Sequence, residues 1–350
     1  METLITMCFY MLTMLISMFF AELAKKKEDI RFLIIPIILL SLIAGCRSYE
    51  VGTDTLRVVE SIEYTCKKGV FSHSKEYLYY FICVILMKIW NNPSFVLFFL
   101  ALLTNGLIFM RIWDFRSNLK ISVTTSLYFM YYFGMSMNIT RQCLAVAIVF
   151  YFTRYLQKKD YVKFLLGVVL AFFIHVSSII AIVFPILYLL YKEKPTKRTW
   201  KIIAGIAVVG IIPFGYMVYR YAEYFTGMTI DIGKMQVVWL VLLGVSCIPI
   251  YWKKRAGLVI NNKTAENEDI RLIFIISLIG GVIAFFGYII PWAGRVGYVF
   301  KVFEILFFGM IFNADEYNEK FRWLIYGILV ILGIYTLMTY AAVVPYSVIW

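Results

Sequence analysis

Long apolar stretches recur from one end of this sequence to the other, and they decide which folds the chain can adopt. A helix that crosses a membrane needs about 20 consecutive, predominantly apolar residues. The chain is 62% hydrophobic and 16% charged, whereas about a quarter of the residues in a soluble domain are charged. We therefore predict an all-α, polytopic bundle of about 11 to 13 membrane helices, short and re-entrant ones included. We expect residues 1–350 to form a single transmembrane domain, with no separate soluble domain.

The basic residues predict how these helices cross the membrane. A net charge of +13 can indicate nucleic-acid binding, but no basic patch or nucleic-acid-binding module is present, so we expect no nucleic-acid partner. The basic residues lie instead in short loops, which favour the cytoplasmic side and contact lipid head groups. The strongest basic loops are residues 22–31, 157–163, 192–201, 253–255 and 314–322. The segments then expected at the outer face are residues 46–75, 138–142 and 291–297.

Residues 162–191 form one apolar run between two basic loops, so they must cross the membrane an even number of times. A single helix of this length would be about 45 Å long at 1.5 Å per residue, against a hydrocarbon thickness of about 30 Å. Two short helices that meet near His175 satisfy both constraints and place His175 toward the outer face. An irregular backbone at membrane depth needs cover from protein or water, so we expect a pocket there.

The segment between the outer loop and the second basic loop leaves one ambiguity in the topology. The number of crossings from residues 46–75 to residues 157–163 must be odd, but four apolar runs lie between them. These runs are residues 76–91, 93–112, 121–137 and 141–156. We predict that residues 76–91, which carry Glu76 and Lys88, lie in the membrane interface.

The first candidate site motif is GCRSYEVGTDTLR, residues 45–57, in the predicted outer loop 46–75. Charges at membrane depth are costly and usually mark a substrate path. Arg47 can bind a phosphate there, while Glu50 or Asp54 orients a hydroxyl or takes its proton. Gly52 permits a tight turn that brings backbone amides near an anion. The alternative is a solvated loop with an internal Arg–Asp pair.

The second motif, NITRQCLAVAIVF, places Arg141 and Gln142 at the start of an otherwise apolar helix. A basic residue is disfavoured at a helix N-terminus by the helix dipole, so its presence needs another reason. Binding of an anion, assisted by the free backbone N–H groups, is one such reason. Snorkelling of the Arg141 side chain to the interface is the alternative.

Two further basic groups lie beside the predicted outer face. His175 is the one histidine within an apolar run, and a histidine suits proton transfer near neutral pH. Arg295 lies between Gly294 and Gly297, where its guanidinium offers a bidentate fork to a phosphate. Tyr298 can stack on a sugar ring, although tyrosine is in any case common at membrane interfaces.

Several familiar motifs are absent from the sequence. We find no DxD, HExxH, P-loop, GxSxG or GxGxxG pattern in a useful context, and therefore predict neither a metal site nor a cofactor. The six cysteines lack metal-ligand spacing. Cys46 and Cys66 can either pair in the outer segment or remain free thiols.

Taken in order, these motifs resemble the EpsG family of bacterial exopolysaccharide polymerases, which is grouped with the Wzy-type O-antigen and capsule polymerases. The resemblance covers nearly the whole chain. Its most specific parts are Arg47–Thr55, Asn138–Ala145 and Ala171–Ser177, with Lys158-Lys159, Gly294-Arg295 and Pro345-Tyr346 at matching places. The outer segment at residues 221–234 is short, whereas related polymerases often carry a large outer loop.

The resemblance implies a GT-C-like, metal-independent and inverting transferase in the bacterial plasma membrane. It would join polyprenyl-diphosphate-linked oligosaccharide units into O-antigen, capsule or exopolysaccharide at the outer face. A flippase and a chain-length regulator are the implied protein partners. We expect Arg141, Arg295 and Arg47 to bind the diphosphate, with His175 or Asp54 as general base.

We expect Gln142, Glu50 and Tyr298 to make further substrate contacts. Two other classes of function remain open at this stage. A ligase that moves finished glycan to another acceptor would use the same cationic groups. A flippase or transporter for lipid-linked glycans would also use outer arginines, but it would need comparable polar groups on the inner half. An O-acyltransferase built on the membrane histidine is a weaker alternative.

Overall fold

The structure is a computed structural model, and it describes residues 2–69, 76–192, 241–245, 264–286, 291–313, 318–339 and 343–349. Within these residues the chain is helical, and its one β contact is an isolated bridge between Arg47 and Val348. Three helices are long and apolar enough to cross a membrane: α1 (Glu2–Lys27), α5 (Pro93–Asp114) and α16 (Glu319–Thr339). The predicted all-α membrane bundle is confirmed.

All of the other described helices except the 23-residue α13 (Thr264–Phe286) are shorter than these three. The other helices are η1 (Ile30–Leu33), α2 (Ile34–Cys46), α3 (Thr55–Lys68), α4 (Tyr77–Ile89), α6 (Ile121–Tyr128), the π-helical turn η3 (Phe129–Phe133), α7 (Gly134–Asn138), α8 (Thr140–Gln157), α9 (Tyr161–Ile174), η4 (Val176–Val183), α10 (Phe184–Lys192), α13 (Thr264–Phe286), α14 (Pro291–Lys301) and α15 (Glu304–Ile311). The short outer segment predicted at residues 221–234 lies outside the described residues.

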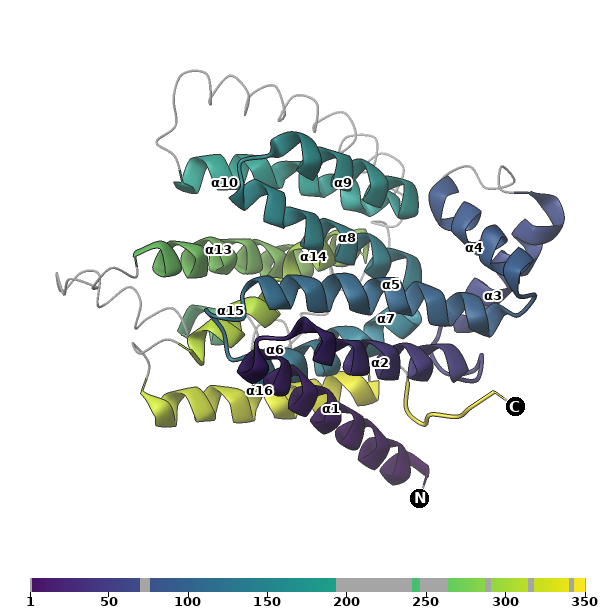
Figure 1. Cartoon of the computed structure of the whole chain (residues 1–350), viewed down its shortest axis with the longest axis horizontal. Helices are drawn as coiled ribbons and strands as arrows, with labels where there is room; N and C mark the ends of the chain where they lie inside the picture. The colour runs from purple at the N-terminus through teal and green to yellow at the C-terminus, as the bar shows by residue number, and fades with distance from the viewer. Residues whose placement is uncertain are drawn as a thin grey trace.

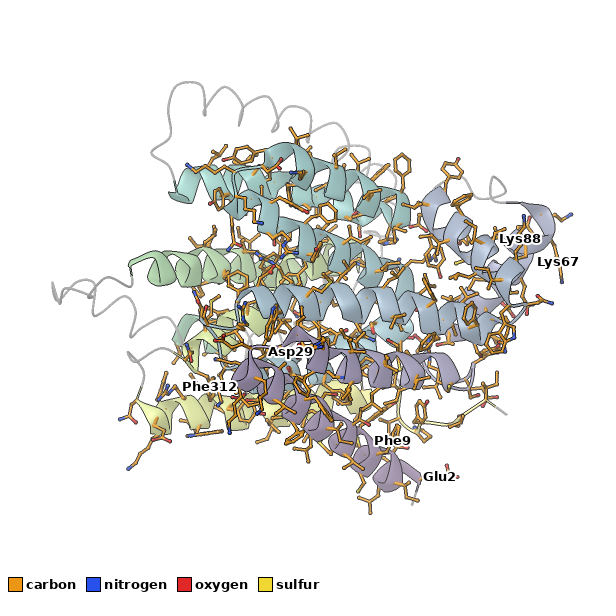
Figure 2. All side chains as sticks on the ribbon, viewed as in Figure 1. Glu2, Phe9, Asp29, Lys67, Lys88 and Phe312 are labelled. Atoms are coloured by element: carbon orange, nitrogen blue, oxygen red, sulfur yellow. The ribbon has the colours of Figure 1, made fainter. Side chains whose placement is uncertain are left out.

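Most of the helices run along one common direction, with α1, α3 and α4 inclined to it, and most connections lie toward two ends of the bundle (Figure 1). We call one the basic end, because α1 ends there with Lys25–Lys27, and Lys158 and Lys159 lie there in the turn after α8. The other end, called the site end, holds the turns after α2, α7 and α9. In Figure 2, Asp29 and Phe312 lie toward the basic end, opposite Lys67 and Lys88.

Local sequence signals explain where the chain enters two of the membrane helices. Asn92 caps α5 because its side chain accepts a hydrogen bond from the Ser94 N–H at 2.8 Å, with Pro93 as the first helical residue. Asp160 caps α9 in the same way, accepting from the Lys163 N–H at 3.1 Å. Each cap therefore satisfies a backbone donor where a new helix begins.

The chain breaks at His175, as the length of the apolar run predicts. Helix α9 ends at Ile174, His175 is extended, and the 3₁₀ helix η4 follows. Near the start of α9, the Phe164 ring stacks on that of Phe184, with centroids 6.3 Å apart. Because Phe184 comes after η4, the chain turns back on itself at His175. The predicted break is confirmed.

The polar segment 46–75 is more regular than the predicted outer loop. Residues 55–68 form the amphipathic helix α3, which buries Val58, Val59 and Ile62. Helix α4 packs against α3, α5 and α9, and Figure 1 shows α3 and α4 together at the site end. Whether residues 76–91 lie in the membrane interface stays a prediction.

Candidate functional site

Three ionisable side chains from separate segments meet at the site end of the bundle. The Glu76 carboxylate contacts His175 through one oxygen, with Oε1 and Nδ1 2.5 Å apart. Its other oxygen, Oε2, accepts a hydrogen bond from Arg141 Nη1 at 2.7 Å. The Glu76 side chain is 12% exposed, against 19% for His175 and 37% for Arg141. A shared carboxylate thus holds the predicted histidine and the predicted arginine together.

The backbone delivers each of these groups at the end of a helix. Glu76 directly precedes α4, Arg141 lies in the first turn of α8, and His175 directly follows α9. Glu76 has φ 65° and ψ 34°, in the left-handed region that non-glycine residues rarely adopt. Such a conformation costs about 1–3 kcal/mol and persists only where its surroundings impose it. The contacts of its carboxylate are part of those surroundings.

Two tyrosines of α4 surround the Arg141 guanidinium. Its central carbon lies 5.7 Å from the Tyr79 ring centroid and 5.8 Å from that of Tyr80, within the range of cation–π attraction. Arg141 Nη1 also donates to the Tyr80 hydroxyl at 3.0 Å. That hydroxyl is 2.8 Å from the Ser61 Oγ of α3. The network therefore fixes one edge of the guanidinium.

The charge state of Glu76 follows from its neighbours. It lies ahead of α4, outside the apolar helices. Burial alone would raise the pKa of this carboxyl, but the hydrogen bond to His175 and the electrostatic interactions with His175 and Arg141 outweigh burial. The backbone N–H of Val176 adds a further hydrogen bond. The pKa of Glu76 is therefore lowered, and the group is a carboxylate at neutral pH.

Arg295 is brought to the same end through Gln142. The buried Gln142 side chain donates from Nε2 to the backbone carbonyl of Arg295, and α14 also packs against η4, which follows His175. The Arg295 side chain is exposed, and it forms no salt bridge with any residue that the structure describes. Tyr298, one turn further along α14, is half-buried.

Arg47 takes a different place from the one predicted. Its side chain is 1% exposed, and its guanidinium donates to backbone carbonyls instead of facing outward. Nη2 bonds the Met137 carbonyl at 2.6 Å and Thr55 Oγ1 at 3.4 Å, while Nη1 bonds the Ala44 carbonyl. Neither the solvated Arg–Asp pair nor an open phosphate site describes this geometry. Arg47 joins the ends of α2 and α7 to the start of α3.

The first two motifs contact each other directly. Asn138 Oδ1 accepts from Thr53 Oγ1 at 3.1 Å and from the Asp54 N–H at 3.0 Å. Gly52 has φ +91°, and a Cβ atom there would lie 3.0 Å from the same Asn138 oxygen. The turn at residues 52–54 is thus built around Asn138. The Asp54 side chain is half-buried and that of Glu50 is exposed; the structure joins neither to the Glu76 cluster.

The C-terminal segment, residues 343–349, packs beside Arg47. The Ser48 N–H donates to the Ser347 carbonyl at 2.7 Å, and the Ile349 N–H donates to the Cys46 carbonyl at 2.9 Å. The Tyr346 hydroxyl donates to the Ile43 carbonyl at 2.9 Å. The late Pro-Tyr motif is therefore a structural contact with α2. Cys46 and Cys66 are both free thiols.

Glu76 is the member of the cluster that sequence reasoning missed. The sequence shows a carboxylate directly before an apolar run, a pattern that indicates an interfacial helix as readily as a site residue. The required odd number of membrane crossings between residues 46–75 and 157–163 restricts the topology. It does not indicate which basic side chain the Glu76 carboxylate contacts.

The family comparison covers this whole arrangement. The EpsG family model matches residues 30–348. The chain belongs to the EpsG family. The matched region of this EpsG protein begins at η1 and includes Glu76, Arg141, His175 and Arg295. EpsG membership supports a membrane-embedded, polymerase-type function in exopolysaccharide or O-antigen synthesis, and at a coarse level it implies lipid-linked sugar substrates. Comparisons with curated proteins and with solved structures find no match.

Proposed function

We propose that this EpsG protein polymerises polyprenyl-diphosphate-linked oligosaccharide units at the outer face of the bacterial plasma membrane. The observation that carries this assignment is the meeting of Arg141 and His175 on Glu76, with Arg295 tied to Gln142 beside them. A cationic group that binds a diphosphate and a group that accepts a proton then lie in one place. The donor is the growing chain on its lipid, and the acceptor is a sugar hydroxyl of a fresh unit.

In the reaction we propose, the acceptor hydroxyl oxygen attacks the anomeric carbon of the donor sugar. The new glycosidic C–O bond forms as the bond from that carbon to the diphosphate oxygen breaks. The bonding electrons leave with the polyprenyl diphosphate, and the hydroxyl proton passes to His175. A single displacement of this kind inverts the anomeric configuration. A GT-C-like, metal-independent transferase is the class that fits these steps.

The leaving diphosphate gains negative charge as the bond breaks, and fixed cations lower the cost of that change. Arg141 and Arg295 are the proposed clamp, since a guanidinium matches the geometry of phosphate oxygens. We favour them over Arg47, whose donors are used by buried carbonyls. We favour His175 over Asp54 as general base because His175 belongs to the cluster. Gln142 supports Arg295, and Tyr298 and Glu50 stay candidates for sugar contacts.

The distribution of charge supports an outward-facing site. Short basic segments favour the cytoplasm, and the end of α1 with Lys25–Lys27 and the turn after α8 with Lys158-Lys159 lie at the end of the bundle opposite the cluster (Figure 1). With that end inside, Glu76, Arg141 and His175 face the outer half of the membrane. Membrane lipids, a flippase that supplies the units and a chain-length regulator are the partners that such a reaction would need.

The test is reconstitution of the full chain in vesicles that contain lipid-linked repeat units. We expect wild-type protein to lengthen the glycans, and we expect Arg141→Ala, His175→Ala and Arg295→Ala to leave single units on the lipid. Arg31→Ala is the matched control, because Arg31 is 81% exposed and pairs only with Asp29 among the described residues. A wild-type distribution of polymer lengths in all three variants would refute the assignment. A change of sidedness without elongation would indicate a transporter, and transfer to a different acceptor would indicate a ligase.

A further inference from the structure

The Glu76 carboxylate has a partner on each oxygen, and both partners belong to the proposed machinery. Oε1 faces His175 Nδ1 at 2.5 Å, and Oε2 faces Arg141 Nη1 at 2.7 Å. Glu76 itself is largely buried behind them, with 12% of its side chain exposed. It therefore lies where it can orient two groups while remaining out of reach of a large substrate.

The contact with Glu76 decides which ring nitrogen of His175 carries the proton. An ionised carboxylate only accepts hydrogen bonds, so Nδ1 must be the donor. A neutral imidazole with its proton on Nδ1 has a free electron pair on Nε2. No residue in the described part of the chain hydrogen-bonds that Nε2 atom. The nitrogen that can take a proton is thus the one left open.

The same carboxylate selects the edge of Arg141 that is available. The hydrogen bonds that the structure gives Arg141 all leave from Nη1, to Glu76 and to Tyr80. Among the described residues, none accepts a hydrogen bond from its Nε or Nη2. These two atoms form one edge of the planar guanidinium, the geometry that binds two oxygens of a phosphate at once. Glu76 and Tyr80 therefore hold one edge and leave the other free.

We propose that Glu76 is the positioning residue of the site, which fixes His175 with its proton on Nδ1 and presents the Nε–Nη2 edge of Arg141. This role rests on the proposed function. In this scheme Glu76 contacts neither donor nor acceptor; it acts through His175, which takes the hydroxyl proton, and through Arg141, which binds the diphosphate. The left-handed backbone at Glu76, with φ 65°, accords with a position maintained at a conformational cost.

The first experiment reads the histidine directly and needs no enzyme assay. The chain has two histidines, so His73→Gln leaves His175 as the sole imidazole, and ¹⁵N-labelled histidine then reports both of its nitrogens by NMR. Across a pH series, we expect the neutral form of His175 to carry its proton on Nδ1. We expect Glu76→Gln in the same background to lose that preference and Glu76→Asp to keep it. A neutral His175 with its proton on Nε2 in the parent protein would overturn the proposal.

The second experiment is the vesicle polymerisation assay with the same variants. We expect Glu76→Gln to lower kcat by about 10² to 10⁴-fold, the contribution that a well-positioned general base makes, because a histidine that loses its orienting carboxylate takes the wrong tautomer. Glu76→Asp keeps the negative charge and should recover part of that loss. Glu60→Gln, an exposed carboxylate on the neighbouring α3, is the matched control and should keep wild-type kcat.

These outcomes separate the positioning role from the proposed function. A parent protein with the expected imidazole signals but no polymerisation would refute the polymerase while leaving the positioning of His175 intact. Wild-type kcat in Glu76→Gln, in a protein that polymerises, would overturn the positioning role. If Glu76→Gln does not fold, the NMR result on the parent protein and the kcat of Glu76→Asp still decide the question, because a loss in Glu76→Asp as large as that in His175→Ala contradicts a role for the charge.

Discussion

Replacement of Arg47 by alanine tests whether this residue holds the fold or binds substrate. The Arg47 side chain is 1% exposed, and it donates to the carbonyls of Ala44 and Met137. Each buried carbonyl left without a donor costs about 1–3 kcal/mol, so the loss of both predicts about 2–6 kcal/mol of unfolding free energy. A lysine ammonium can donate to one of these carbonyls but cannot replace the two separate nitrogens with which the guanidinium donates to both. Arg47→Lys should therefore cost about half as much.

The measurement is reversible unfolding in mixed micelles, with polymerisation measured in parallel on protein that remains folded. Arg57 lies on the exposed side of α3, so Arg57→Ala serves as the control and should change neither quantity by much. We expect Arg47→Ala to lose stability and the folded fraction to retain activity. A variant with wild-type unfolding free energy and no polymer would refute this reasoning and return Arg47 to the diphosphate site.

Three further predictions follow from single contacts. Asn138→Ala removes the acceptor for Thr53 Oγ1 and the Asp54 N–H and should lower the unfolding free energy by about 1–3 kcal/mol in the same assay. Asn138→Asp keeps an acceptor oxygen and should lower it less. Equal losses in the two variants would contradict the role given to Oδ1. Gln142→Ala releases the Arg295 carbonyl and should raise the KM for the donor about 10-fold or more, while an unchanged KM would show that Gln142 does not position Arg295. The pKa of Glu76 lies below its ordinary value of 4.5, so ionised Glu76 stabilises the fold above that pH, and this stabilisation is lost as the pH falls through the lower folded-state pKa. The unfolding free energy of the wild-type protein should therefore fall with pH over this acidic range, and Glu76→Gln should lack that part of the fall. Identical pH profiles of the two proteins would contradict the lowered pKa.

Much of the architecture could be predicted because apolar length and loop charge act locally along the chain. The break at His175 follows from one run that is too long for one crossing, and the helices over residues 93–112 and 141–156 follow from hydropathy alone. Helix α3 was missed although Val58, Val59 and Ile62 have helical spacing, because the polar composition of residues 46–75 favoured a loop. The common placement of Arg141 and His175 follows from the alternation of crossings.

The pairings within the site could not be predicted because they depend on which helix ends close on one another. An arginine at the end of an apolar helix can face head groups, an anion or buried carbonyls, and the sequence near Arg47 is compatible with all three. The same ambiguity applies to Glu76, because a carboxylate before an apolar run is equally compatible with a position in the membrane interface. Only the packing of α4 beside α9 and the start of α8 brings it to His175 and Arg141.

The contact between residues 343–349 and the first two helices has a consequence for biosynthesis. The Tyr10 hydroxyl donates to the Val343 carbonyl, a partner 333 positions later in the chain. At a synthesis rate of about 5–20 residues per second, α1 waits roughly 15 to 70 s for that partner to be made. The early helices must therefore persist in the bilayer without the backbone partners of Cys46 and Ser48, until the ribosome has synthesised residues 343–349.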